Sequence, residues 1–180
     1  MSETAGSTSL AGSPPEVTMR RSLAVYIGGV LVAGLLAGLM WHLLASPPNY
    51  TIGDDKGAII TERGLSQTIA MDIWYVLIGI VFALLLGAFS WVVLRGVGWP
   101  IVLVAMAGAL LAAWLAWQFG HLLGPRDFAV RVGQASPGDR VPMDLDLHSA
   151  ALILVWPLCV NIPILLASLM SALRPHRPVD

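Results

Sequence analysis

Two histidines at matching places in the chain are the first candidates for chemistry. His42 and His121 each precede Leu-Leu and then a proline-containing break. Together with carboxylates such as Asp72 or Asp144, imidazoles can bind zinc or copper or relay protons. Their local spacing matches no known metal motif such as HExxH, and a histidine at a helix end also bonds free carbonyls readily. We therefore expect a structural role for both, with no metal, no cofactor and no catalytic residue.

Carboxylates are the other groups that could support acid/base chemistry. They gather in two polar stretches, residues 46–71 and 124–146, without a recognisable nucleophile or oxyanion donor. Because hydrated loops keep carboxylates solvated, we expect loops here rather than a catalytic pair. The long apolar stretches carry no Asp, Glu, Lys or Arg near their middles. Ion channels and proton-coupled transporters usually need such groups, which argues against both unless other subunits complete a pathway.

The last apolar stretch is the most unusual. Pro157 and Pro163 each remove a backbone donor and so free the carbonyls four residues earlier, and Asn161 lies between them. Within a membrane, such polar groups persist only where other groups satisfy them. One interpretation is a kinked helix that lines a small polar cavity or a docking groove for a partner. The other is a tolerated kink in which Asn161 bonds a neighbouring helix.

Membrane-spanning helices must position these candidates. The 180-residue chain is 57% apolar and only 12% charged, whereas soluble domains are about one quarter charged. Four stretches lack Asp, Glu, Lys and Arg over at least the roughly 20 residues that cross the hydrocarbon: Ser22–Ala45, Ile73–Leu94, Gly96–Pro125 and Leu147–Leu173. We therefore expect an all-α membrane protein, a bundle of four transmembrane helices at residues 22–45, 72–94, 99–123 and 147–173.

Positive charges set the expected orientation. The arginines that flank the helices on one side are Arg20, Arg21, Arg95, Arg174 and Arg177. The loops on the other side carry mixed charge. By the positive-inside rule, both termini are cytoplasmic and the two loops, residues 46–71 and 124–146, are external.

The terminal segments and the net charge complete this picture. Residues 1–21 and 174–180 are polar and lack an apolar period, so we expect disordered cytoplasmic tails. The formal net charge of −1 does not suggest binding to nucleic acid. The lipid bilayer is the one environment that the composition requires.

The two halves of the chain share a weak pattern. Each has a helix ending in His-Leu-Leu, a proline break, a β-prone stretch, a turn rich in Gly and Asp, and a Met-Asp entry into the next helix. This pattern predicts a two-fold internal repeat about an axis along the membrane normal, although apolar helices also generate such matches by chance. It further predicts a β-hairpin in each loop, with strands near residues 50–52 and 128–132. Because a lone hairpin is marginal in water, we expect the two loops to pack together as a cap.

Small residues are the expected means of helix association. Gly34 and Gly38 form a GxxxG pattern in the first span, and Gly79 and Gly87 line one face of the second. Such residues let helices approach closely in lipid, where no hydrophobic force drives them together. We expect packing within the bundle, with a homodimer seam along the first helix as the alternative.

Tryptophans are expected to mark depth. Trp41 and Trp117 fall near predicted span ends, as interfacial aromatic residues do. Trp114 and Trp156 lie deeper and are expected inside the bundle.

Three short motifs resemble those of a known group of proteins. They are the Gly-x-x-Trp of Gly38 to Trp41, the Asp-Lys-Gly of Asp55–Gly57, and the Trp-Pro of Trp156 and Pro157. With four spans over Ser22–Leu173, the chain resembles an uncharacterised, mycobacterial-type family of actinobacterial membrane proteins grouped as a domain of unknown function. The resemblance implies an actinobacterial plasma membrane and no assigned activity.

The expected function follows from these features. We expect a non-enzymatic accessory or scaffolding subunit of a cell-envelope or membrane complex, bound to a membrane protein partner or to its own copies. The alternatives are a small-molecule or lipid transport component built on the kinked fourth helix, and an outer-face metal-dependent enzyme built on the histidines and aspartates.

Overall fold

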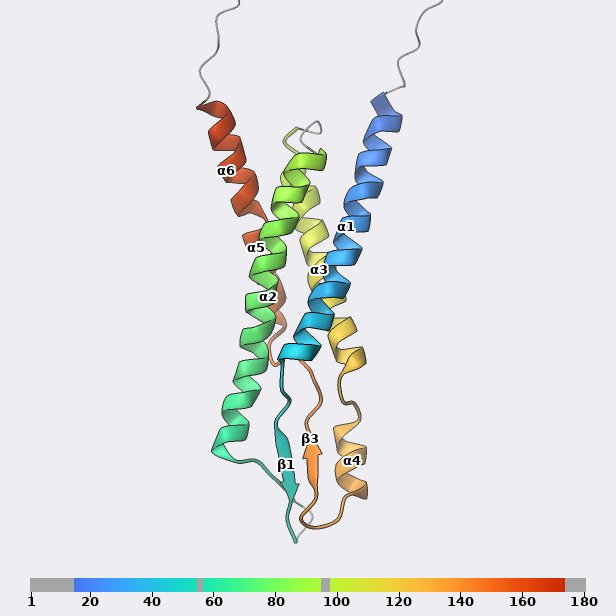
Figure 1. Ribbon diagram of the computed structural model, residues 1–180, viewed down its shortest axis with the longest axis vertical. Coiled ribbons are helices and arrows are strands. Elements are labelled where there is room, and N and C mark those ends of the chain that lie inside the picture. Colours follow the sequence, from blue (N-terminus) through green and yellow to red (C-terminus); the bar gives the residue numbers. More distant parts are fainter. Residues whose placement is uncertain (1–14, 55–56, 95–97, 174–180) are drawn as a thin grey trace, which may run out of the picture.

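The computed structural model describes residues 15–54, 57–94 and 98–173. Four helical spans run side by side, and a small sheet with a short helix lies at one end (Figure 1). The helices of the first three spans are α1 (Pro15–Leu44), α2 (Glu62–Leu94) and α3 (Ile101–Leu123). The cap contains β1 (Asn49–Ile52), β2 (Ala58–Ile59), α4 (Phe128–Gln134) and β3 (Arg140–Pro142). The last span comprises η2 (Ala150–Leu154), α5 (Val155–Cys159) and α6 (Asn161–Ala172).

Four helical segments are long and apolar enough to cross a membrane, which confirms the predicted membrane fold. Figure 1 shows α1 beginning and α6 ending at the same end of the bundle, with the sheet at the opposite end. This is the arrangement that an even number of spans requires. Both loops therefore lie on one side, as the charge pattern predicted.

Two helices begin earlier than the sequence suggested. α2 begins at Glu62, within the predicted loop 46–71, because Thr61 Oγ1 accepts a hydrogen bond from the Gly64 N–H at 3.2 Å and caps the first turn. α1 begins at Pro15, within the predicted tail 1–21, since proline is accepted in the first turn of a helix. The remaining tail residues, 1–14 and 174–180, lie outside the described residues.

The cap joins the loops of the two halves through one sheet, in the order β2-β1-β3. β1 pairs antiparallel with β2, so the predicted hairpin of the first loop is present. β1 also pairs antiparallel with β3, with Tyr50 opposite Val141 and Thr51 opposite Arg140. The expected packing of the two loops is therefore achieved by backbone hydrogen bonds between them.

The second loop does not form the predicted hairpin, because its β-prone stretch is helix α4. The carboxylate of Asp144 accepts the Phe128 N–H at 3.1 Å and pairs with Arg131 at 2.8 Å. Asp144 thus holds both the first turn and one side chain of the short helix. Because this contact crosses the loop, the local β propensity of the segment could not predict it. The two loops consequently differ in structure, and the internal repeat does not extend to them.

The last span is broken rather than continuous. A 3-10 segment, Ala150–Leu154, leads into α5, and α6 starts after Val160. Pro157 and Pro163 fall in α5 and α6, where each lacks the N–H that a regular helix requires. The predicted fourth span is present at Ala150–Ala172, and its hydrogen-bond pattern divides it into three short pieces.

Cysteine labelling tests the orientation. In a Cys159→Ser background, we expect Ser136→Cys in the second loop to react with a membrane-impermeant maleimide in intact cells, because Ser136 is exposed between α4 and β3 of the cap. A cysteine appended after Asp180 should react only after lysis. The reverse pattern would place the termini outside.

Candidate functional site

The first packing surface joins α1 to α3. An ideal Cβ placed on Gly34 would lie 2.9 Å from the Ala112 carbonyl oxygen, and one on Gly38 would lie 2.6 Å from that of Ala116. Such distances leave no room for a side chain. The predicted GxxxG surface is thus covered by α3 of the same chain, which leaves no place there for a homodimer seam.

The second packing surface joins α2 to the broken span. A Cβ on Gly79 would collide with the Trp156 indole, and one on Gly87 with the Val160 carbonyl oxygen and the Pro163 ring. Gly79 and Gly87 therefore form the groove that accepts α5 and the start of α6. All four candidate glycines serve contacts inside the bundle.

The broken span contains buried polar atoms without partners. Asn161 Nδ2 donates to the Pro157 carbonyl at 2.7 Å, so it bonds its own segment and not a neighbouring helix as one interpretation expected. Among the described residues, Asn161 Oδ1 and Trp156 Nε1 are buried and have no hydrogen-bond partner. An unsatisfied buried group costs about 1–3 kcal/mol. The prolines and Asn161 therefore create local polarity inside an apolar bundle.

Aromatic side chains connect the helices through backbone carbonyls, which the sequence analysis missed. The Tyr75 hydroxyl donates to the Ala113 carbonyl at 2.8 Å, and Trp41 Nε1 donates to the Met71 carbonyl at 2.9 Å. Trp41 lies near the end of the first span, as expected, and its side chain is fully buried. Trp114, expected inside the bundle, is 47% exposed, whereas Trp156 is fully buried as expected.

The histidines and aspartates near the cap make structural contacts. His121 Nδ1 lies 2.8 Å from the Leu145 carbonyl oxygen, which ties the end of α3 to the second loop. Nearby, Trp117 Nε1 donates to Asp146 at 2.8 Å. The His42 side chain is half-buried and makes no hydrogen bond within the described part of the chain. Across residues 15–54, 57–94 and 98–173, no three His, Cys, Asp or Glu side chains come together as a metal site.

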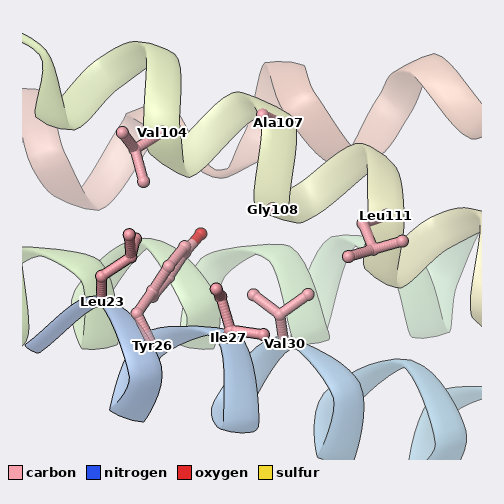
Figure 2. Close-up of a pocket in the computed structure, with 8 residues that line it drawn as sticks. All are labelled: Leu23, Tyr26, Ile27, Val30, Val104, Ala107, Gly108 and Leu111. Atoms are coloured by element: carbon pink, nitrogen blue, oxygen red, sulfur yellow. The ribbon is translucent and has the colours of Figure 1, made fainter. Parts of the chain in front are cut away.

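Two apolar grooves flank α1 in the membrane-spanning region. The groove between α1 and α3 has a volume of about 260 Å³, and Figure 2 shows Tyr26 pointing across it towards Gly108 of α3. The groove between α1 and α2 has a volume of about 220 Å³ and is lined by residues such as Gly29 and Phe89. Both offer apolar surface without reactive groups, so lipid chains suit them.

A polar cleft of about 370 Å³ lies in the cap, between the sheet and the first turns of α2. Its lining residues are Asn49, Thr51, Thr61, Gly64, Gln67 and Arg140. The cleft is not apparent in the sequence, because only the pairing of β3 with β1 brings Arg140 beside the first loop.

An apolar stripe follows the outer end of α2. Leu65, Ile69 and Ile73 recur every four residues, which places them on one face of the helix, and they are 55%, 63% and 52% exposed. Asp72, a charged residue on the same helix, lies 3.4 Å from His148 Nδ1. Leu65 and Ile69 lie beyond Asp72 towards the cap, at about 10 Å and about 5 Å along the axis.

Comparison with known proteins adds no relative. No protein-family model, curated protein or solved structure matches the chain. Function must therefore be inferred from the chain's own geometry.

A pair of glycine substitutions tests the helix contacts. Gly38→Ala should destabilise the folded protein by about 1–3 kcal/mol, because its Cβ meets the α3 backbone. Gly28→Ala is the matched control, since nothing lies within 4 Å of a Cβ there. Thermal unfolding in detergent measures both. Equal stability of the two variants would contradict this packing.

Proposed function

We propose that the protein is a non-enzymatic accessory subunit of a membrane complex and binds another membrane protein along α2. It lies in the bacterial plasma membrane with both termini in the cytoplasm and the cap outside. The observation that carries this proposal is the apolar stripe on the outer part of α2.

The position of the stripe is what requires a partner. Charged side chains avoid the hydrocarbon core of the membrane. The core therefore does not extend beyond Asp72 towards the cap. Leu65 and Ile69 then lie in the headgroup region or in water, where more than half of each side chain is exposed. Contiguous apolar surface in such a place is typical of protein interfaces.

The shape of the stripe indicates the kind of partner. It continues without a break through Ile73 to the exposed Leu77, which lies deeper along the same helix. A partner helix that crosses the bilayer and extends past it could cover the whole length. A soluble protein would cover only the part nearest the cap.

Within the membrane-spanning part, other helices of the bundle cover much of the remaining surface of α2. Gly79 and Gly87 face the broken span, and α1 and α3 pack against the same helix. The stripe is therefore the surface of α2 that remains available along both the membrane and the cap.

Affinity purification from native membranes in mild detergent tests the proposal. The tagged wild-type chain should recover one stoichiometric membrane protein. Leu65→Gln with Ile69→Gln should reduce that recovery at least ten-fold, because the stripe becomes polar. Val130→Gln is the matched control, an exposed apolar residue on α4 that lies outside the stripe. Recovery of the chain alone, or only with its own copies, would contradict the proposal that a different membrane protein binds it.

A transport role is the second candidate, supported by Trp156 Nε1 and Asn161 Oδ1. These buried atoms lack hydrogen-bond partners in the described chain. A polar substrate or lipid headgroup that moves past the break in the last span could supply such partners. This account predicts that Asn161→Ala abolishes lipid or solute flux in reconstituted vesicles while expression stays unchanged. Flux equal to wild type, or no flux in the wild type, would remove this candidate.

A further inference from the structure

The sheet of the cap has one apolar and one polar face. Because side chains alternate along a strand, Tyr50 and Ile52 of β1 point to one face, and Asn49 and Thr51 to the other. Ile52 is buried, and the Tyr50 ring lies 5.0 Å from that of Phe128 in α4. α4 therefore covers the apolar face, and the polar face borders the cleft beside α2.

A single cation lies among polar neutral groups in this cleft. Arg140 of β3 stands directly opposite Thr51 of β1 in the strand register. Among the described residues that line the cleft, Arg140 carries the only charge, and no carboxylate accompanies it. The lining therefore attracts an anion.

Most of the hydrogen-bonding capacity of the cleft is unused. Thr61 Oγ1 accepts from the Gly64 N–H, which leaves its own O–H free to donate. Within the described part of the chain, the side chains of Asn49, Gln67 and Arg140 make no hydrogen bond or ion pair. The cleft thus offers a guanidinium fork together with amide and hydroxyl groups.

From this combination we infer that the cleft binds a phosphorylated polyol. A guanidinium fork matches the oxygens of a phosphate bidentately. The amides of Asn49 and Gln67 and the hydroxyl of Thr51 can each donate to and accept from ring hydroxyls. A volume of about 370 Å³ is at the small end of the usual range for ligand pockets and fits one phosphorylated ring.

Two sources could present this chemistry at the outer face. One is a soluble sugar phosphate, and the other is the headgroup of an inositol phospholipid. Gly64 and Gln67 lie on α2 beyond Asp72, about 8–12 Å along the helix axis, and Thr61 directly precedes the helix. The cleft also lies on a different face of α2 from Leu65 and Ile69, so this inference does not depend on the proposed partner.

Binding of glucose 6-phosphate to the full chain in phosphatidylcholine nanodiscs tests the inference by calorimetry. Wild type should bind saturably, and Arg140→Gln should weaken binding by about ten-fold or more, since one charge-assisted contact is lost. Arg126→Gln is the matched control, an exposed arginine in the second loop outside the cleft. It should bind as wild type does.

Parallel probes define the ligand. Glucose and inorganic phosphate should each bind at least ten-fold more weakly than glucose 6-phosphate. In nanodiscs that contain phosphatidylinositol, weakened binding of glucose 6-phosphate assigns the site to the lipid headgroup, and unchanged binding assigns it to a soluble ligand. Absence of saturable binding, equal binding by Arg140→Gln, or phosphate alone binding as tightly would overturn the inference.

Discussion

The close approach of α1 to α3 is the constraint on which the rest of the structure depends. In lipid, apolar surface gains nothing by leaving its solvent, so helices associate through tight contact and hydrogen bonds. Gly34 and Gly38 bring the two backbones together, with the alanines of α3 on the other side. Two hydrogen bonds then tie α2 to this pair: Trp41 on α1 donates to the Met71 carbonyl of α2, and Tyr75 on α2 donates to the Ala113 carbonyl of α3. The same alignment places both loops at one end, where β1 meets β3.

The broken last span shows how the bundle accommodates polarity. Its two prolines leave a short, irregular segment that fits the glycine groove of α2, where Gly79 and Gly87 make room for Trp156 and Val160. Its packing against α2 also leaves the outer stripe of that helix as surface available for contact with another protein.

Much of the architecture was predictable, because long uncharged stretches and their flanking arginines depend on local sequence alone. The packing role of the glycines followed from the same logic. The failures involve contacts between distant residues. Asp144 holds the β-prone segment that begins at Phe128 as a helix, and the hydrogen bond of the Trp41 indole to the Met71 carbonyl depends on a residue 30 positions away. The polar cleft likewise exists only because Arg140 pairs across the sheet.

The central claim is that the outer stripe of α2 is covered by another membrane protein. Photo-crosslinking in native membranes, with benzoylphenylalanine in place of Ile69, tests it most directly. The account predicts one discrete adduct with a different protein, absent when the same residue replaces Val130. Adducts with lipid alone, with a second copy of the chain, or with no protein at all would contradict it.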